Sequence, residues 1–224
     1  MTMLTRVLIV AEMQGRDLLR RRLALLILVA LPLTFYLANA ADPYAPVLTG
    51  VGMSWAVAGA ALFAVLAARS VDPRLVQAGF RPGELLLGRL LLLAGLGILL
   101  ATLCAAVVLP ISAPPHPVIV LPGVVLAALI GVPLGLAVAA LLPRELEGML
   151  TIIGVVGIEL SLPSGAALAP FLPLYGPIKI LALSSGDEGS PVPWLLHGLG
   201  YAAALVALAV LVWTRRVRAR RPPT

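Results

Sequence analysis

The sequence predicts an all-α integral membrane protein with six transmembrane helices, and three observations support this fold class. Apolar residues make up 61% of the 224-residue chain and charged residues only 12%, with a mean hydropathy of +1.07. Soluble domains are about half apolar and about a quarter charged. Apolar stretches of roughly 20 residues, enough for a helix to cross ~30 Å of hydrocarbon, recur along the chain. The basic residues lie almost entirely on one side of this pattern.

The expected spans lie between turns and charged segments, and their order sets the topology. They cover residues 23–41, 47–68, 90–111, 119–142, 149–174 and 194–214. If the N-terminus is cytoplasmic, all of the 16 basic residues except Lys179 lie on the cytoplasmic side. Short loops rich in Lys and Arg stay in the cytoplasm, so we expect both termini there. The preference for arginine over lysine suggests a GC-rich bacterial genome, and the expected location is a bacterial inner membrane.

Residues 1–22 are expected to form an amphipathic helix that lies in the cytoplasmic interface. Its apolar positions oppose its charged ones, as in helices of this kind: Leu4, Val7, Leu8, Ala11, Leu18 and Leu19 against Arg6, Glu12, Arg16, Asp17 and Arg20. The alternative is a signal peptide cleaved after Ala40, because Ala38-Asn39-Ala40 resembles a cleavage site. A charged leader of about 22 residues is long for a signal peptide, so we expect an uncleaved chain.

The loops between the expected spans differ on the two sides of the membrane. The outer connections, 41–46, 112–117 and 183–193, are short and rich in turn residues, so none can form a folded domain. The cytoplasmic loop 69–83 is longer. In it Asp72-Pro73 is a helix-start signal, with aspartate as N-cap and proline at the first helical position. We expect one or two helical turns there, a solvated loop being the alternative.

The fifth span, residues 149–174, is unlike the others because glycines and prolines interrupt it. Since proline removes a backbone donor and clashes with the preceding turn, we expect a helix that ends near Leu162. Short re-entrant pieces, 166–172 and 177–183, would then return the chain to the outer face. Broken backbone at membrane depth requires burial in protein or a wet cavity.

Glu159 is the only acidic residue well inside an expected span. A charged side chain there costs at least ~3 kcal/mol on insertion scales, so it should face the bundle interior. With Ser161 and Ser164 it could line a substrate path, relay protons or contact a cation. The alternative is a protonated or hydrogen-bonded carboxyl that joins helices.

Two further features of the spans point to packing. Gly131 and Gly135 form a small-xxx-small pair that could allow close helix contact. Cys104, the single cysteine, can form no intrachain disulfide and is expected to be a small core residue rather than a functional thiol.

Neither a catalytic site nor a metal site is expected in this chain. Ser161 or Ser164 with His197 is similar to the pair of rhomboid-type proteases, but residues 162–165 read Leu-Pro-Ser-Gly and lack the first glycine of that motif. His116 and His197 do not make a metal spacing, and neither H-E-x-x-H nor a phosphate-binding G-x-x-x-x-G-K-[ST] occurs. The chain alone therefore cannot hydrolyse ATP in the usual way.

Nucleic acid is not an expected partner either. The net charge is +6, but the arginine clusters contain no aromatic platforms for bases. The charge lies next to the spans, where it favours anionic lipid.

Three segments together resemble the membrane subunit of a type-2 ABC exporter. They are Arg20-Arg21-Arg22 running into Leu31-Pro32, then Arg-Pro-Gly-Glu-Leu-Leu-Leu-Gly-Arg at 81–89, then Ser164-Gly165 followed by Pro170 and Leu172-Pro173. Their order and spacing carry the resemblance. The chain departs from the family at residues 176–179, Gly-Pro-Ile-Lys, where aromatic and basic residues are usual.

The resemblance implies a division of the chain into three parts. Residues 1–22 would be the connecting helix, with Arg16, Arg20 and Arg21, and 23–214 the six-span domain with coupling loop 69–83. Residues 215–224 would be a basic cytoplasmic tail. Contacts to the ATPase would come from five residues of the coupling loop: Asp72, Arg74, Val76, Gln77 and Phe80.

The resemblance also implies partners and an activity. A separate nucleotide-binding ABC ATPase subunit would hold ATP and magnesium, and a second permease subunit, identical or different, would complete the pathway. The cargo would be hydrophobic or amphipathic, drug-like or lipid-like, and moved outward. The alternatives are a secondary carrier or channel with Glu159 as ion-coupling group, or a scaffold without transport.

Overall fold

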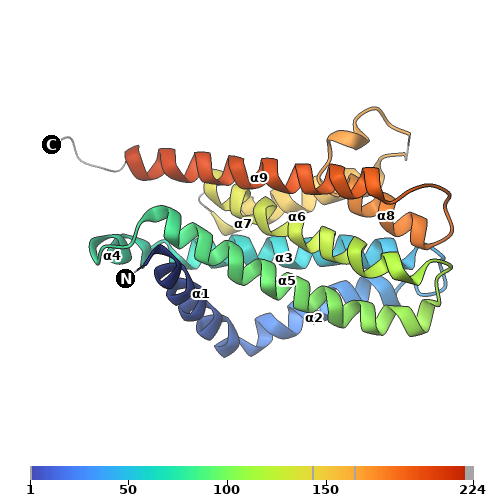
Figure 1. Ribbon diagram of the computed structural model, residues 1–224, viewed down its shortest axis with the longest axis horizontal. Helices are drawn as coiled ribbons and strands as arrows, with labels where there is room; N and C mark the ends of the chain where they lie inside the picture. Colours follow the sequence, from blue (N-terminus) through green and yellow to red (C-terminus); the bar gives the residue numbers. More distant parts are fainter. Residues whose placement is uncertain (1, 143, 164, 220–224) are drawn as a thin grey trace.

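The computed structural model describes residues 2–142, 144–163 and 165–219, and their regular structure is helical throughout. In chain order the helices are α1 (Met3–Arg20), α2 (Arg22–Leu37), α3 (Ala45–Ala68), α4 (Asp72–Gln77), α5 (Pro82–Ser112), η1 (Pro117–Ile119), α6 (Val120–Leu141), α7 (Glu145–Ser161), η2 (Ala169–Phe171), α8 (Tyr175–Ser184) and α9 (Val192–Ala219). The long helices run side by side as one bundle (Figure 1). At one end lie α4 and both ends of the chain, and α8 lies toward the other end.

Several of these helices could cross a membrane, which makes the chain a membrane protein. Within the described residues four segments are long and apolar enough, namely Ala45–Ala68, Pro82–Ser112, Pro117–Leu141 and Val192–Arg215. They correspond to the second, third, fourth and sixth expected spans. The bounds differ by a few residues, mostly because each observed helix continues into its flanking loop.

The first and fifth expected spans are shorter in the structure than the sequence predicts, so six full spans are not confirmed. Helix α2 has 16 residues and α7 has 17, which gives lengths of roughly 24 and 26 Å against ~30 Å of hydrocarbon. After α2 the chain turns at once, and Asn39 Nδ2 donates a hydrogen bond to the carbonyl of Phe35. After α7 the backbone becomes extended at Leu162, directly before Pro163.

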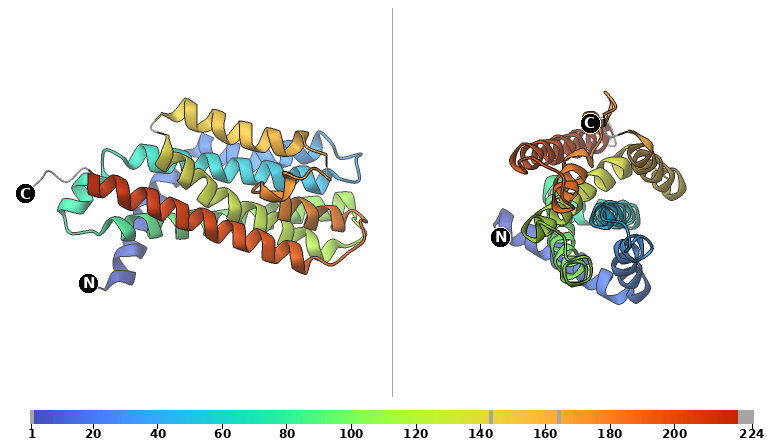
Figure 2. Two further views of the ribbon diagram at one scale, coloured as in Figure 1. Left: turned by 90° about the horizontal axis from the view of Figure 1, so that it is seen from above. Right: turned by 90° about the vertical axis from the view of Figure 1, so that its right-hand side faces the viewer.

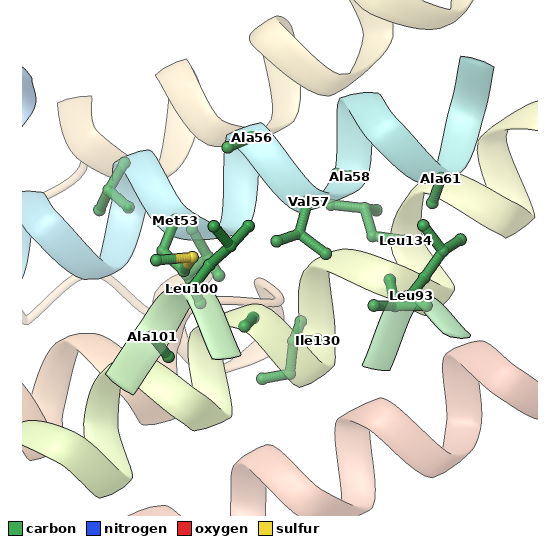
Figure 3. Close-up of a cluster of buried hydrophobic side chains, with 14 of the residues drawn as sticks. Met53, Ala56, Val57, Ala58, Ala61, Leu93, Leu100, Ala101, Ile130 and Leu134 are labelled. Atoms are coloured by element: carbon green, nitrogen blue, oxygen red, sulfur yellow. The ribbon is translucent and has the colours of Figure 1, made fainter. Parts of the chain in front are cut away.

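The core of the bundle lies between α3, α5 and α6. Figure 3 shows Met53 and Val57 of α3 beside Leu93 and Leu100 of α5 and Ile130 of α6. These side chains are at most 4% exposed. Cys104 is also buried in this cluster, as expected for a small core residue.

The close contact expected at Gly131 and Gly135 is confirmed. A Cβ at Gly131 would lie 2.6 Å from the carbonyl oxygen of Ser54, and one at Gly135 would lie 2.1 Å from that of Ala58. The backbones of α3 and α6 therefore touch along this line, which only glycine permits on the α6 side.

The chain between α7 and α9 is broken, as the sequence predicts. Helix α7 ends at Ser161, and two short helices, η2 and α8, follow before α9 begins. Helix α8 fits tightly against α9, because a Cβ at Gly176 would lie 2.7 Å from the carbonyl oxygen of Trp194. Helix α8 is buried against the bundle, as broken backbone in a membrane requires, whereas Pro170 and Phe171 of η2 are exposed.

Candidate functional site

The features that bear on function gather at the end of the bundle that holds α4. Helix α1 leaves the bundle at an angle to the long helices (Figures 1 and 2). Its buried side chains, Val7 and Val10, press against Gly88 of α5, where an added Cβ would lie 2.8 Å from Val10 Cβ and 2.9 Å from the Val7 carbonyl oxygen. Gly88 therefore sets how closely α1 and α5 approach.

The outer face of α1 remains apolar and exposed. Leu4, Leu8 and Leu19 are each more than half exposed, although they belong to the apolar pattern of the sequence. Only part of that pattern packs on the protein, and Val10, which the pattern did not include, supplies one of the contacts. An exposed apolar stripe beside charged residues suits a helix in the membrane interface.

Arg6 ties α1 to the chain segment between α4 and α5. Its Nη1 donates a hydrogen bond to the carbonyl of Gly79 over 2.6 Å and lies 3.7 Å from Oε2 of Glu84. The Glu84 carboxylate is buried and also accepts a hydrogen bond from the backbone N–H of Arg81 over 2.7 Å. Such a buried carboxylate needs its partners, because an unpaired one is costly.

Helix α4 is present where the sequence predicts it, but the expected role of Asp72 as N-cap is wrong. The helix includes Asp72, the N-cap position belongs to Val71, and Pro73 follows in the first turn. The Asp72 carboxylate instead forms an ion pair with Nη2 of Arg89. Arg89 is completely buried, and a buried charge requires a counter-charge more than a helix end requires a cap.

Arg89 joins three helices at this end. Besides its ion pair to Asp72 in α4, its guanidinium lies over the ring of Trp213 in α9, 5.4 Å from the ring centre. Its Nε and Nη1 have no acceptor among the described residues. Arg89 borders the third span expected from the sequence, and an arginine about two turns inside an apolar helix is a signal that a partner must exist.

The remaining residues expected to contact an ATPase lie on the surface of α4 and the loop after it. Arg74, Val76 and Gln77 are exposed, and Phe80 is half-buried. The structure thus separates Asp72, which pairs with Arg89 of α5, from the three exposed residues, with Phe80 intermediate in exposure. A docking partner could reach the exposed ones.

The arginines expected in the connecting helix lie at its far end. Nη2 of Arg16 is 2.5 Å from Oε1 of Glu12, and Nη2 of Arg21 is 3.0 Å from Oδ2 of Asp17. Arg20 is exposed in the last turn of α1. Arg21 is the residue at which α1 ends and α2 begins, so the two helices change direction there.

A cleft of 670 Å³ opens between α1, α2, α3 and the first part of α5. Its walls are mostly apolar. Polar side chains, among them Gln14, Arg21, Asp72 and Arg89, line it as well.

The residues expected along a substrate path lie elsewhere, around the end of α7. Glu159 is 8% exposed, and among the described residues no donor meets hydrogen-bond geometry at its carboxylate oxygens, although the backbone N–H of Leu174 lies near the carboxylate. Ser161 is exposed and its Oγ donates to the carbonyl of Gly157 over 2.7 Å. Ser164 lies outside the described residues. Glu159 and Ser161 lie in the last turn of α7 and are not among the residues that line the cleft.

His197 contacts the backbone of η2. Its Nε2 lies 2.9 Å from the carbonyl oxygen of Pro170 in η2, and Tyr201 donates to the carbonyl of Phe171 over 2.8 Å. These bonds fasten η2 to α9. Across the described part of the chain, no three His, Cys, Asp or Glu side chains gather closely enough to hold a metal ion.

The chain's expected tail begins inside a helix. Helix α9 continues to Ala219, and Arg215 at its surface is exposed. The last residues of the expected tail, 220–224, lie outside the described residues.

The sequence matches no protein-family model and no curated protein.

Proposed function

We propose that this chain is the permease subunit of an ATP-driven exporter of the type-2 ABC class. The observation that carries the proposal is the joining of α1, α4 and α5 at one end of an apolar bundle. Arg6 links α1 to Gly79 and Glu84, and Arg89 links α4 to α5. An amphipathic helix and a short surface helix, both tied to membrane-spanning helices, give a separate ATPase subunit two elements on which to act.

Movement of α4 would reach the membrane domain through the Asp72–Arg89 ion pair. Arg89 sits in α5 and stacks on Trp213 of α9, so a push on α4 acts on two long helices. The Arg6 contacts carry the same movement to α1. A partner can shift such a bundle only if it binds one arrangement better than the other, so the exposed side chains of α4 must contact the ATPase differently in its two states.

The proposed topology has six crossings with both termini in the cytoplasm of a bacterial cell. Helices α2 and α7 would cross a locally thinned bilayer, since short helices are accommodated at modest cost. Both chain ends and α4 lie at the same end of the bundle, and α8 lies toward the opposite end, with Lys179 in it (Figure 1). This placement supports the arginine-rich end as the cytoplasmic one.

A second permease subunit would cover the exposed apolar faces of α7 and α9. Only 11% of the most apolar stretch of α9 is buried, and Leu150, Ile158 and Leu160 on α7 are exposed. Lipid or a second subunit must meet such surfaces. A pathway between two subunits lined by these side chains suits a hydrophobic or amphipathic cargo, drug-like or lipid-like.

The direct test is to purify the chain alone and together with a co-expressed ABC ATPase subunit from the same organism. We expect no ATP hydrolysis by the chain alone, and hydrolysis stimulated by apolar substrates when both are reconstituted in membranes. ATP hydrolysis by the isolated chain, or failure of the two proteins to co-purify, would contradict the proposal.

The buried carboxyl of Glu159 favours one alternative, a secondary carrier. A carrier would transport without an ATPase, driven by an ion gradient, and Glu159→Gln would abolish that transport. In the proposed exporter the same substitution keeps ATP-dependent transport. Measuring transport in vesicles with ATP alone and with a proton gradient alone separates the two.

A further inference from the structure

The cleft between α1, α2, α3 and α5 has the shape of a lipid site. Along α3 it runs from Trp55 to Ala68, which is roughly 20 Å at ~1.5 Å per residue. That length matches one leaflet of hydrocarbon, about 15 Å, plus the polar region. Its volume of 670 Å³ lies within the roughly 300–1,000 Å³ that ligand pockets usually have.

The cleft has an apolar part and a polar part. Its deep part is lined by apolar side chains, including Ile27 and Leu31 of α2 and Ala60 and Ala64 of α3. The polar and charged side chains that line the cleft are Asp72 of α4 and Arg89 of α5, which form an ion pair, then Glu145 at the start of α7, and Gln14, Asp17 and Arg21 along α1 and at its junction with α2. The apolar part of the cleft suits an acyl chain, and the polar part suits the headgroup of a lipid.

The polar part holds hydrogen-bonding groups that nothing in the described chain satisfies. Arg89 is completely buried, yet its Nε and Nη1 have no acceptor, because Asp72 engages only Nη2 and Trp213 contacts the face of the guanidinium. The buried Oε1 of Gln14 likewise has no donor. Buried arginine donors without acceptors are costly and are well matched by phosphate oxygens.

The side chains that line the cleft carry a net charge of −1, because two arginines stand against three carboxylates. Arg21 pairs with Asp17 and Arg89 with Asp72, which leaves Glu145 as the one additional carboxylate among the cleft-lining residues. A net positive field is therefore absent from the cleft. The site should recognise a phosphate through hydrogen bonds rather than a negative headgroup through overall charge.

We propose that this cleft binds one phospholipid of the arginine-side leaflet, with an acyl chain along α3 and its phosphate at Nε and Nη1 of Arg89. Gly88, next to Arg89, packs against α1, so a helix lying in the interface holds Arg89 at the level of the headgroups. The inference rests on the membrane placement of α1 in the proposed function but not on ATP-driven transport.

The test is native mass spectrometry of the full chain in detergent micelles, titrated with single lipids. The probes are phosphatidylethanolamine, phosphatidylcholine and phosphatidylglycerol, with diacylglycerol of the same chains as the probe without phosphate. We expect all three phospholipids to bind at one site, about tenfold or more tightly than diacylglycerol. Because no ATPase is present, failure here and failure of the proposed function are distinguishable.

Two variants and one control assign the site. Arg89→Gln should remove the preference for phospholipid over diacylglycerol. Ala64→Phe leaves Arg89 and Asp72 in place but fills the apolar part, so it should lower the binding of every lipid and remains informative if Arg89→Gln fails to fold. Arg144→Gln removes an exposed arginine outside the cleft, paired with Glu147, and should bind as the parent does.

A second measurement places the bound chain in the cleft. Phospholipid with brominated acyl chains should quench Trp55, and Trp55→Phe should remove that part of the quenching. Equal binding of diacylglycerol and phospholipid, binding of phosphatidylglycerol alone, or parental binding by Ala64→Phe would each overturn the proposal.

Discussion

At Gly135 the backbone of α6 comes so close to α3 that a single methyl group cannot fit. An added Cβ would meet the Ala58 carbonyl oxygen at 2.1 Å, and backbone cannot move aside as a flexible side chain can. We expect Gly135→Ala to lower the free energy of unfolding by about 1–3 kcal/mol through overpacking. The measurement is thermal unfolding in detergent followed by a thiol-reactive dye, which reports exposure of the buried Cys104.

Gly95 provides the matched control for that substitution. It lies in α5 with nothing within 4 Å of an added Cβ. Gly95→Ala should leave the unfolding temperature unchanged or raise it slightly, because alanine is the better helix former by ~1 kcal/mol. Equal effects of the two substitutions would mean that the α3–α6 contact is not as close as described.

Tyr44 and Asp187 connect two loops at the α8 end and provide a pH-dependent contact. The Tyr44 hydroxyl donates a hydrogen bond to Oδ1 of Asp187 over 2.9 Å. This bond, with the negative charge of Asp187, raises the pKa of Tyr44 above its ordinary value of about 10. The pKa of Tyr44 is therefore higher in the folded than in the unfolded chain. The contact stabilises the folded state fully below pH ~10, and this stabilisation is lost as the pH rises through the pKa of the folded chain.

The prediction is checked by ultraviolet titration of tyrosinate, with Tyr44→Phe subtracted to isolate this residue. Asp187→Asn should move the pKa of Tyr44 down toward about 10. An unchanged titration in Asp187→Asn would show that the two loops do not meet in solution.

At the scale of the elements, α4 carries the exposed side chains that we propose contact the ATPase. Phe80→Ala, or Arg74→Glu with its charge reversed, should weaken ATPase docking or uncouple hydrolysis from transport. An aromatic anchor at an interface often contributes about 2 kcal/mol or more on truncation. Neither residue lies in the apolar bundle, so membrane insertion should persist. The measurement is co-purification of the ATPase, followed by substrate-stimulated hydrolysis in reconstituted membranes.

Val118 supplies a control at the other end of the molecule. It is 84% exposed in η1, so Val118→Ala should dock and transport as the parent does. If Phe80→Ala and Arg74→Glu also behave like the parent, the segment 69–83 is only a connector and the coupling role is wrong.

At the scale of the whole molecule, the proposed topology places α4 and the two chain ends in the cytoplasm. In a Cys104→Ser background, single cysteines replace the exposed Ala78 beside α4 and the exposed Glu188 beside α8. A thiol reagent that cannot cross the membrane should label position 188 in intact cells and position 78 only after lysis. The reverse pattern would invert the topology and remove the ATPase from the side where α4 lies.

The same topology requires that residues 1–40 stay attached. Helix α1 packs on Gly88 and donates to Gly79 through Arg6, so cleavage after Ala40 would remove both contacts. Intact-mass measurement of the purified chain decides this. A mature chain that starts at Ala41 would leave α4 and α5 without the helix proposed to connect them to the ATPase.

The sequence by itself determined the class of the protein and the places where its helices are interrupted. Hydropathy and the one-sided arginines predict an apolar helical bundle, and prolines and glycines predict the short helix at α4 and the break after α7. These properties follow from local composition, because a residue's transfer free energy and backbone restrictions act wherever it stands in the chain. The close helix contact at Gly131 and Gly135 was predictable for the same reason, because the four-residue spacing of two small residues is a local pattern.

Only the tertiary structure decided which residues meet. Asp72 pairs with Arg89, 17 positions away, Arg6 reaches Gly79 across 73, and Trp213 covers Arg89 from the last helix. The sequence shows that an arginine in an apolar segment needs an acidic partner. Both Glu84 and Asp72 lie near Arg89 in the sequence, and only the packing of the helices selects Asp72. The lengths of α2 and α7 also depended on turns that hydropathy does not encode. Distance along the chain carries no information about such contacts, because folding brings together groups whose attraction depends on separation in space and on burial.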